Sequence, residues 1–140
     1  MKYALPIALA VLVGFAGLSA FRGRVAPTPE VFGQTTSLDD GIREASSSGK
    51  PVVALVTADW CPPCQMLKRD TLTDPAVAAW IDEYTVPVYI NSDENPADAG
   101  KLQVTALPTT VVLRDGQIVA SSTGFASPEE YLGFLKSSVQ

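Results

Sequence analysis

Residues 57–70 read TADWCPPCQMLKRD, and this stretch holds both cysteines of the chain, Cys61 and Cys64, separated only by two prolines. It follows PVVALVT, residues 51–57, a run that is almost entirely apolar, as in a strand buried on both faces of a sheet. Pro62 suits the first position of a helix. The sequence therefore predicts a strand-to-helix corner, with Cys61 at the helix start and Cys64 one turn further on.

Metal sites, structural disulfides and redox pairs all use neighbouring cysteines. A structural zinc needs four sulfur or nitrogen ligands. The chain has 2 Cys and no His, so only a metal shared across a dimer or a two-coordinate copper(I) site stays open. A structural disulfide between residues so close in sequence would constrain the unfolded chain little. A reactive pair is favoured, because free N–H groups at a helix start stabilise a thiolate.

The composition fits one globular domain and argues against some partners. The 140 residues are 46% hydrophobic, enough for a single core. With 15 acidic and 10 basic residues, the formal net charge is -5, so we expect no nucleic-acid partner. Because the chain lacks histidine, acid–base work falls to carboxylates, lysines or the thiols.

The first segment, residues 1–24, differs from the rest of the chain. An uncharged apolar run, residues 4–21, follows Lys2 and precedes Arg22 and Arg24. No polar face interrupts this run, so it predicts a signal peptide or a membrane anchor rather than a core helix. The run is longer than a usual signal core and its cleavage motifs are partial. We therefore favour an uncleaved anchor, with the following domain exported.

Residues 25–34 contain the proline, glycine and small polar residues of a linker, so the folded domain is expected to span residues 35–140. Ser37 can cap a first helix. Beyond the cysteines, the pattern predicts a helix, a strand, a loop with a short helix, a β-hairpin and a final helix, in residues 73–84, 85–91, 92–102, 108–123 and 127–139. This order predicts an α/β fold whose mixed sheet carries helices on both faces.

Several separated motifs share one resemblance. Four segments resemble thioredoxin in the same order, namely ADWCPPCQML at 58–67, NSDENP at 91–96, VTALPTTVVLRDGQIV at 104–119 and TGF at 123–125. ADWC together with TLTDPAV, residues 71–77, is similar to the C-terminal thioredoxin-like domain of bacterial transmembrane thiol:disulfide interchange proteins. The resemblance implies a thioredoxin fold, a mixed central sheet flanked by helices, here preceded by an N-terminal hydrophobic helix.

The resemblance also implies roles for individual residues. Cys61 would be the nucleophile that attacks a substrate disulfide, and Cys64 the resolving thiol that breaks the mixed disulfide, leaving a Cys61–Cys64 disulfide. Pro108 matches the cis-proline of the family, which would present the backbone of Leu107 to a bound peptide. The residues expected to form the substrate-binding surface are Trp60, Pro62, Pro63, Leu107 and Pro108.

The departures from the family pattern affect how protons are transferred and whether the protein acts as a reductase or as an oxidant. Leu55 stands where thioredoxin has a buried aspartate, and Tyr89 where it has the accompanying lysine, so neither charge is left unpaired. Water or Asp59 would then have to transfer protons. Gln65 replaces a usual lysine, and two prolines remove N–H donors from the helix start. The thiolate of Cys61 should be only modestly stabilised, which favours a reductase over a strong oxidant.

These features predict an enzyme, a protein-disulfide reductase that acts outside the cytoplasm, in the periplasm or at the outer face of the cell membrane. Its partners would be protein disulfide or dithiol substrates and a membrane electron-relay reductase. The domain is expected to be a monomer without cofactor or metal, with Cys61 exposed and Cys64 shielded. The alternatives are a disulfide oxidase or isomerase, a cytochrome-maturation thioredoxin, a copper-handling protein and a non-catalytic binding module.

Overall fold

A four-stranded mixed sheet forms the centre of the domain. The computed structural model describes residues 25–34 and 37–139, so the predicted signal or anchor segment, with its hydrophobic helix, lies outside the described residues. The strands are β1 (Val52–Thr57), β2 (Val86–Asn91), β3 (Thr109–Arg114) and β4 (Gln117–Thr123), in the order β2-β1-β3-β4. β1 runs parallel to β2 and antiparallel to β3, and β3 pairs antiparallel with β4. The predicted mixed sheet is confirmed.

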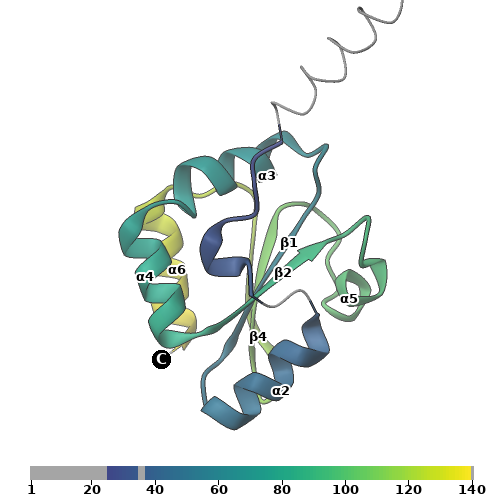
Figure 1. Cartoon of the computed structure of the whole chain (residues 1–140), viewed down its shortest axis with the longest axis vertical. Helices are drawn as coiled ribbons and strands as arrows, with labels where there is room; N and C mark the ends of the chain where they lie inside the picture. Colours follow the sequence, from purple (N-terminus) through teal and green to yellow (C-terminus); the bar gives the residue numbers. More distant parts are fainter. Residues whose placement is uncertain (1–24, 35–36, 140) are drawn as a thin grey trace, which may run out of the picture.

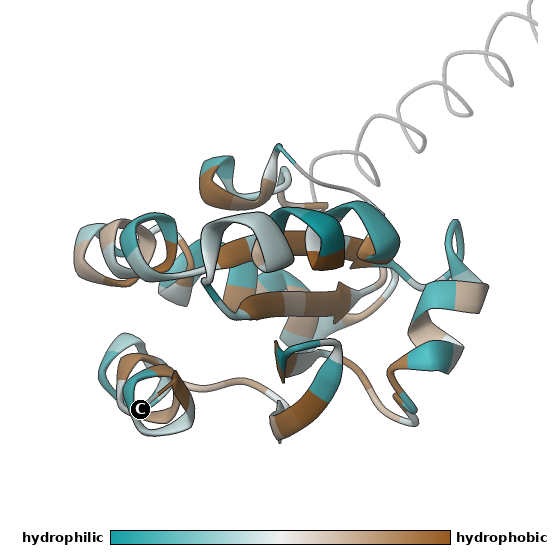
Figure 2. Ribbon diagram, turned by 90° about the horizontal axis from the view of Figure 1, so that it is seen from below, coloured by the Kyte–Doolittle hydropathy of each residue, from teal (hydrophilic) through white to brown (hydrophobic). Residues whose placement is uncertain are grey.

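Helices cover both faces of this sheet (Figure 1). Val53 and Leu55 of β1 pack with α4 (Pro75–Tyr84) and α6 (Pro128–Val139) in one core cluster. Val52 and Ala54 point the other way, into a second cluster with α2 (Leu38–Ser48) and α5 (Pro96–Lys101). Figure 2 shows the hydrophobic strands enclosed between these helices. Every residue of β1 is buried, which explains its nearly unbroken apolar sequence.

Local signals set the element boundaries. Ser37 caps α2, with its Oγ accepting from the Asp40 N–H, and Asp74 caps α4 by accepting from two backbone N–H groups. Asp115 (φ 54) and Gly116 (φ 74) both have positive φ in the two-residue turn between β3 and β4. Two such residues match the right-handed twist of the paired strands, so the predicted hairpin forms there.

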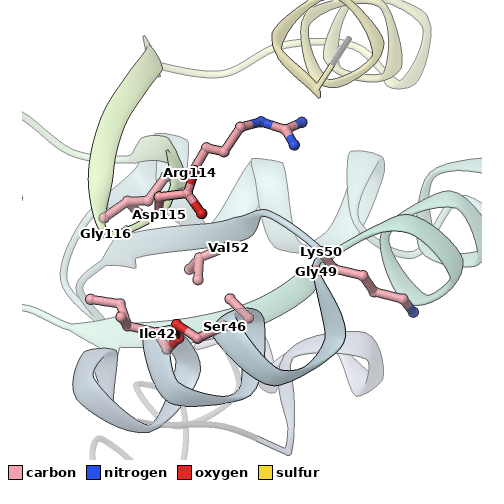
Figure 3. Close-up of a pocket in the computed structure, with 10 residues that line it drawn as sticks. Ile42, Ser46, Gly49, Lys50, Val52, Arg114, Asp115 and Gly116 are labelled. Atoms are coloured by element: carbon pink, nitrogen blue, oxygen red, sulfur yellow. Dashed lines mark hydrogen bonds between the residues drawn. The ribbon is translucent and has the colours of Figure 1, made fainter.

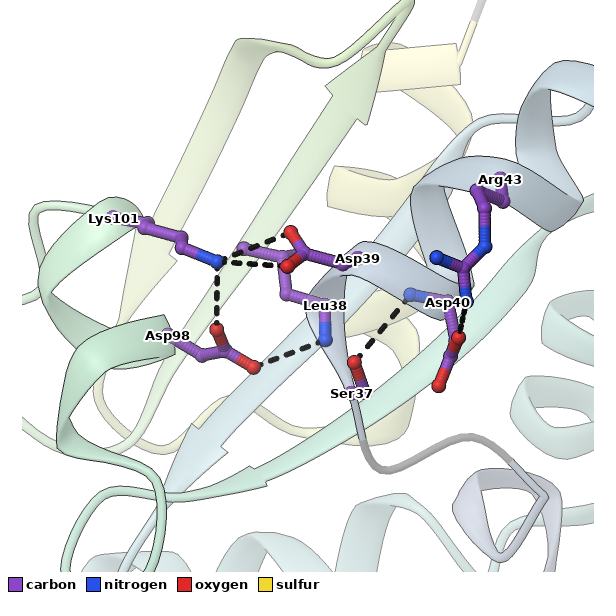
Figure 4. A network of polar contacts seen from close by, with 7 residues as sticks. All are labelled: Ser37, Leu38, Asp39, Asp40, Arg43, Asp98 and Lys101. Carbon is purple, nitrogen blue, oxygen red and sulfur yellow. Dashed lines mark hydrogen bonds and ion pairs between the residues drawn. The ribbon is translucent and has the colours of Figure 1, made fainter.

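Charged groups join α2 to α5 (Figure 4). Asp98 Oδ2 of α5 accepts from the Leu38 N–H at the start of α2, at 3.1 Å. The Lys101 ammonium lies 3.2 Å from Asp98 Oδ1 and 3.1 Å from both carboxylate oxygens of Asp39. One acidic side chain thus satisfies a helix N-terminus and a cation together.

The helix that follows Cys61 changes its winding. It begins as α3 (Pro62–Met66) and continues as a π-helical turn, η2 (Leu67–Thr71), in which the Leu72 N–H donates to the Leu67 carbonyl at 3.0 Å. The helix predicted to begin at Pro62 is present, but the wider turn was not predicted. This turn buries Leu67, Lys68 and Thr71. A lysine is therefore carried into the interior one helical turn beyond Cys64.

Residues 25–34, predicted as a linker, pack against the domain. They include a short helix, η1 (Glu30–Phe32), and the side chain of Phe32 is fully buried in the core cluster that contains Leu55 and Val77. Ala26 is buried as well. The linker interpretation rested on proline and glycine content, which describes the chain locally and does not show where its few apolar side chains go.

The predicted membrane anchor, residues 1–24, is not among the residues that the structure describes. Within residues 25–34 and 37–139, none of the helices combines the length and apolar character needed to cross a bilayer. The apolar run at residues 4–21 lies outside the described residues.

We expect Phe32→Ala to lower the free energy of unfolding by about 3–5 kcal/mol, since it removes a fully buried aromatic side chain from the core. Urea denaturation would measure this. Glu30→Ala is the matched control, because Glu30 is exposed in the same short helix and should change stability by less than about 0.5 kcal/mol. A loss below about 1 kcal/mol for Phe32→Ala would restore the linker interpretation.

Candidate active site

The two cysteines lie where β1 turns into α3. β1 ends at Thr57, and Cys61 is the N-cap of α3, with extended backbone angles (φ -90, ψ 107). Cys61 and Cys64 form a disulfide, with their Cα atoms 5.2 Å apart. The Cys64 N–H also donates to the sulfur of Cys61 at 3.3 Å. The predicted corner therefore holds the nucleophile candidate at the helix N-terminus and the second cysteine one turn on.

Few backbone donors face the Cys61 sulfur. Pro62 and Pro63 occupy the first two positions of α3, and proline carries no N–H. The Cys64 N–H is the donor that reaches the sulfur. A thiolate on Cys61 would therefore draw less from the helix start than it would with three free N–H groups.

Both sulfurs are shielded in the disulfide form. Cys61 is 3% exposed and Cys64 1%. They form a small cluster with Ala58, against which Leu107 packs. The expectation that Cys61 is exposed is not met in this state, because a side chain from a loop distant in sequence covers it. Only the tertiary structure places that loop there.

The loop before β3 is fixed opposite the cysteines. The Leu107–Pro108 peptide bond is cis, as the resemblance predicts. Pro108 is buried, and its carbonyl accepts from the Gly124 N–H at 2.8 Å. Thr109 Oγ1 donates to the Ala106 carbonyl at 2.8 Å. These contacts hold Leu107 against the cysteine pair.

An apolar surface adjoins the cysteines on the other side. Trp60 is 63% exposed, and its Nε1 donates to Asp93 Oδ2 at 2.9 Å, which fixes the indole. Trp60, Pro62 and Met66 line a groove of about 430 Å³ together with polar and N-terminal neighbours, namely Val25, Asp59, Gln65 and Arg69. Of the residues predicted to bind substrate, Trp60 and Pro62 lie in this groove. Leu107 packs on the disulfide itself.

Gln65 connects the active-site loop to the N-terminal segment. Its Nε2 donates to the carbonyls of Ala58 and Asp59, at 3.1 and 3.2 Å, and its Oε1 accepts from the Ala26 N–H at 2.6 Å. In the sequence, Gln65 could be read only as a missing lysine. The structure shows a buried amide that uses both ends to fix the backbone before Cys61.

Lys68 binds the carbonyl group of Ala26, the residue whose N–H binds Gln65. Its ammonium donates to the Ala26 carbonyl at 2.9 Å and to Tyr89 Oη at 3.4 Å, and it lies 5.9 Å from the centre of the Tyr89 ring. Burial lowers the pKa of Lys68, the Asp59 carboxylate opposes this by raising it, and the Arg69 guanidinium lowers it further. Burial likewise raises the pKa of Tyr89.

The match to known sequences is clear. Residues 38–138 match a family model described as a thioredoxin-like domain.

The chain belongs to the thioredoxin-like family.

Individual relatives agree with this assignment. Thioredoxin from Bacillus subtilis is 38% identical over 88 residues, which cover 63% of this chain and 81% of that protein. The thiol:disulfide interchange protein DsbD 1 from Pseudomonas aeruginosa is 40% identical over 65 residues, 46% of this chain. The chain spans only 11% of the length of that relative.

Solved structures share the fold. A thioredoxin from Thermus thermophilus superposes with a TM-score of 0.65 at 24% identity, covering 73% of this chain and 83% of its own. A structure described as DsbH oxidoreductase gives a TM-score of 0.67 at 17% identity, covering 83% of this chain and 87% of its own. With its paired Cys61 and Cys64, this thioredoxin-like chain is a disulfide oxidoreductase.

Sequence reasoning missed two residues of this thioredoxin-like site. Ala26 was assigned to a linker, yet both its backbone polar groups bind side chains of the active-site helix. Lys68 was not singled out, although it follows Cys64 by four positions, a spacing that places two side chains on one helix face. Asp59, proposed for proton transfer, is exposed and acts electrostatically on Lys68.

A second hollow is remote from the cysteines. It measures about 70 Å³ and lies between the end of α2 and the turn that joins β3 to β4 (Figure 3). Val52, at the start of β1, forms part of its wall, whereas the cysteines follow the end of β1. The length of the strand separates it from the redox site.

Proposed function

We propose that this thioredoxin-like protein reduces protein disulfides outside the cytoplasm. The observation that supports reduction rather than oxidation of substrates is the sparse stabilisation of the Cys61 sulfur. It accepts a hydrogen bond from the Cys64 N–H, whereas the two prolines at the helix start have no N–H to donate. A poorly stabilised thiolate disfavours the reduced form, so the protein gives up electrons readily. Gln65 adds no positive charge, because it is neutral and bound to carbonyls.

The reaction follows thiol–disulfide exchange. The Cys61 thiolate attacks one sulfur of the substrate disulfide, forms a mixed disulfide and releases the other substrate sulfur as a thiolate, which takes up a proton. Cys64 then loses its proton and attacks the Cys61 sulfur, which releases the second substrate thiolate and leaves the Cys61–Cys64 disulfide. Two electrons and two protons pass from the dithiol to the substrate. The disulfide state of the structure is the product of this step.

The surface around the pair supports a peptide substrate. Trp60 and Met66 are exposed apolar side chains beside Cys61, and Leu107 borders the disulfide from the opposite loop. A peptide bound between Trp60 and the 107–108 backbone would bring its own disulfide to Cys61. Pro63 is half-buried and Pro108 is buried, so both expose less surface to a substrate than Trp60 does.

The compartment is inferred from the N-terminal sequence. Residues 4–21 form an apolar run flanked by basic residues, and disulfides persist mainly in oxidising compartments. The similarity to part of a thiol:disulfide interchange protein supports the exchange chemistry. A reductase there must be recharged, so we propose a membrane dithiol relay as electron donor. The protein would act as a monomer, because one chain carries both cysteines.

We expect Cys64→Ala to accumulate a mixed disulfide with substrate through Cys61, because the resolving thiol is gone. Cys61→Ala should trap much less, since Cys61 and not Cys64 is the N-cap of α3. Non-reducing electrophoresis of each variant after incubation with a disulfide-containing protein measures this. Equal trapping by the two variants would reverse or abolish the assigned roles.

We also expect the Cys61–Cys64 disulfide to be hard to reduce and the pKa of Cys61 to lie nearer neutrality than in strong oxidants. Equilibration with glutathione buffers gives the potential, and absorbance titration of Cys64→Ala gives the thiolate pKa. Pro62→Gly is the informative variant, because it restores an N–H at the helix start and should lower that pKa. A potential near roughly -120 mV would make the protein an oxidase instead.

For the compartment, we expect a reporter fused after Gln140 to be active on the extracytoplasmic side of the membrane. Removal of residues 1–24 should leave a folded, redox-active protein in the cytoplasm, because the described domain begins after them. A reporter that is active only in the cytoplasm would contradict export.

A further inference from the structure

Lys68 is an unusual feature of the interior. It is 2% exposed, although lysine is rarely buried without a charged partner. Its hydrogen bonds go to neutral groups, the Ala26 carbonyl and the Tyr89 hydroxyl. The carbonyl oxygen and the phenol oxygen both accept hydrogen bonds more strongly from a charged amine than from a neutral one. The site is thus built to hold an ammonium group out of water.

The position of Lys68 relates it to the cysteines. Cys64 and Lys68 are four residues apart on one continuous helical segment, so their Cβ atoms lie about 5–6 Å from one another on the same face. Because the intervening space is protein interior, the charge is less screened than at the surface. The ammonium of Lys68 therefore stabilises negative charge on the sulfurs of the reduced cysteine pair.

The other charged and titratable groups around Lys68 come from η2, from β2 and from the loops that follow β1 and β2. Asp59 belongs to the loop after β1, Arg69 to η2, and Tyr89 to β2. A polar cavity of about 270 Å³ is lined by these elements and the N-terminal segment, with Asp59, Lys68, Tyr89, Asn91 and Glu94 as its polar walls. Asp59 and Glu94 oppose the field of Lys68 at the sulfurs. However, Asp59 and Glu94 are both exposed, so water screens their charges more strongly.

We propose that the buried ammonium of Lys68 stabilises the thiolate of the reduced Cys61–Cys64 pair, and that residues 25–28 are part of the redox site because they hold this charge in place. The Ala26 carbonyl is a direct ligand of the ammonium, and Gln65 fixes the Ala26 N–H, so the segment cannot shift without disturbing both. The inference rests on the proposed function in one respect, the role of Cys61 as the attacking thiol.

This charge also limits how reducing the protein can be. With the Cys64 N–H alone, the reduced form would be disfavoured and difficult to regenerate. Lys68 raises the population of thiolate, which speeds attack and allows an external dithiol to recharge the pair. Its removal should therefore shift the equilibrium towards the disulfide.

The test compares three substitutions of Lys68 in the full chain. Lys68→Met removes charge and hydrogen bonds, Lys68→Gln removes the charge but retains a donor for the Ala26 carbonyl, and Lys68→Arg retains the charge. Each is combined with Cys64→Ala for titration of the Cys61 thiolate, and each is made alone for equilibration with glutathione. Lys136→Met is the matched control, because Lys136 is an exposed lysine on α6. Thermal unfolding verifies that each variant is folded.

Both neutral variants should raise the pKa of Cys61, so that below this pKa the thiolate fraction at a fixed pH falls about threefold or more. The glutathione equilibrium should shift towards the disulfide in the same two variants. Lys68→Arg and Lys136→Met should stay close to wild type. If Lys68→Gln matches wild type while Lys68→Met does not, the hydrogen bond to the Ala26 carbonyl rather than the charge is responsible, and the proposal is wrong. An unchanged titration in both neutral variants also overturns it.

The trapping experiment separates the two hypotheses. If Cys64→Ala forms mixed disulfides but neutral Lys68 variants leave the titration and equilibrium unchanged, the role of Lys68 fails and the proposed function stands. If Cys64→Ala traps no substrate while Lys68 still shifts the pKa of Cys61, the electrostatic role stands and the proposed reductase function fails.

Discussion

The burial of β1 on both faces is the constraint on which the rest of this structure depends. All six residues of the strand are buried, with neighbours on both sides in the sheet and a helical layer on each face. Packing on all sides fixes the position of β1, and therefore also the point at the end of the sheet where the chain continues beyond Thr57. Cys61 follows directly and caps the next helix, so packing of apolar side chains determines where the sulfur lies.

The polar groups around the cysteines form one connected arrangement. Gln65 holds the carbonyls of the loop before Cys61 and, with Lys68, binds both backbone groups of Ala26. All but the part-buried contact to the Asp59 carbonyl are buried, so they satisfy groups that would otherwise be left without a partner in the interior. The N-terminal segment therefore belongs to the site as well as to the core, where Phe32 anchors it.

Much of the fold followed from local chemistry. The apolar run of β1, the caps Ser37 and Asp74 and the turn at Asp115 and Gly116 act within a few residues, so the sequence alone predicted the corresponding elements. The cysteine pair and the cis bond before Pro108 were expected from motif spacing and resemblance. The π turn at Leu67–Thr71 was not predicted, because its winding serves packing between distant elements rather than any local preference.

The sequence by itself determined the chemistry of this protein, two thiols at a helix start with two prolines and no histidine to assist them. The tertiary structure decided the surroundings of those thiols. Leu107 covers Cys61 in the disulfide state, and Tyr89 and Ala26 surround the ammonium of Lys68, all from segments far from the cysteines in sequence. Burial and electrostatic field depend on every group nearby in space, whereas sequence spacing describes only neighbours along the chain.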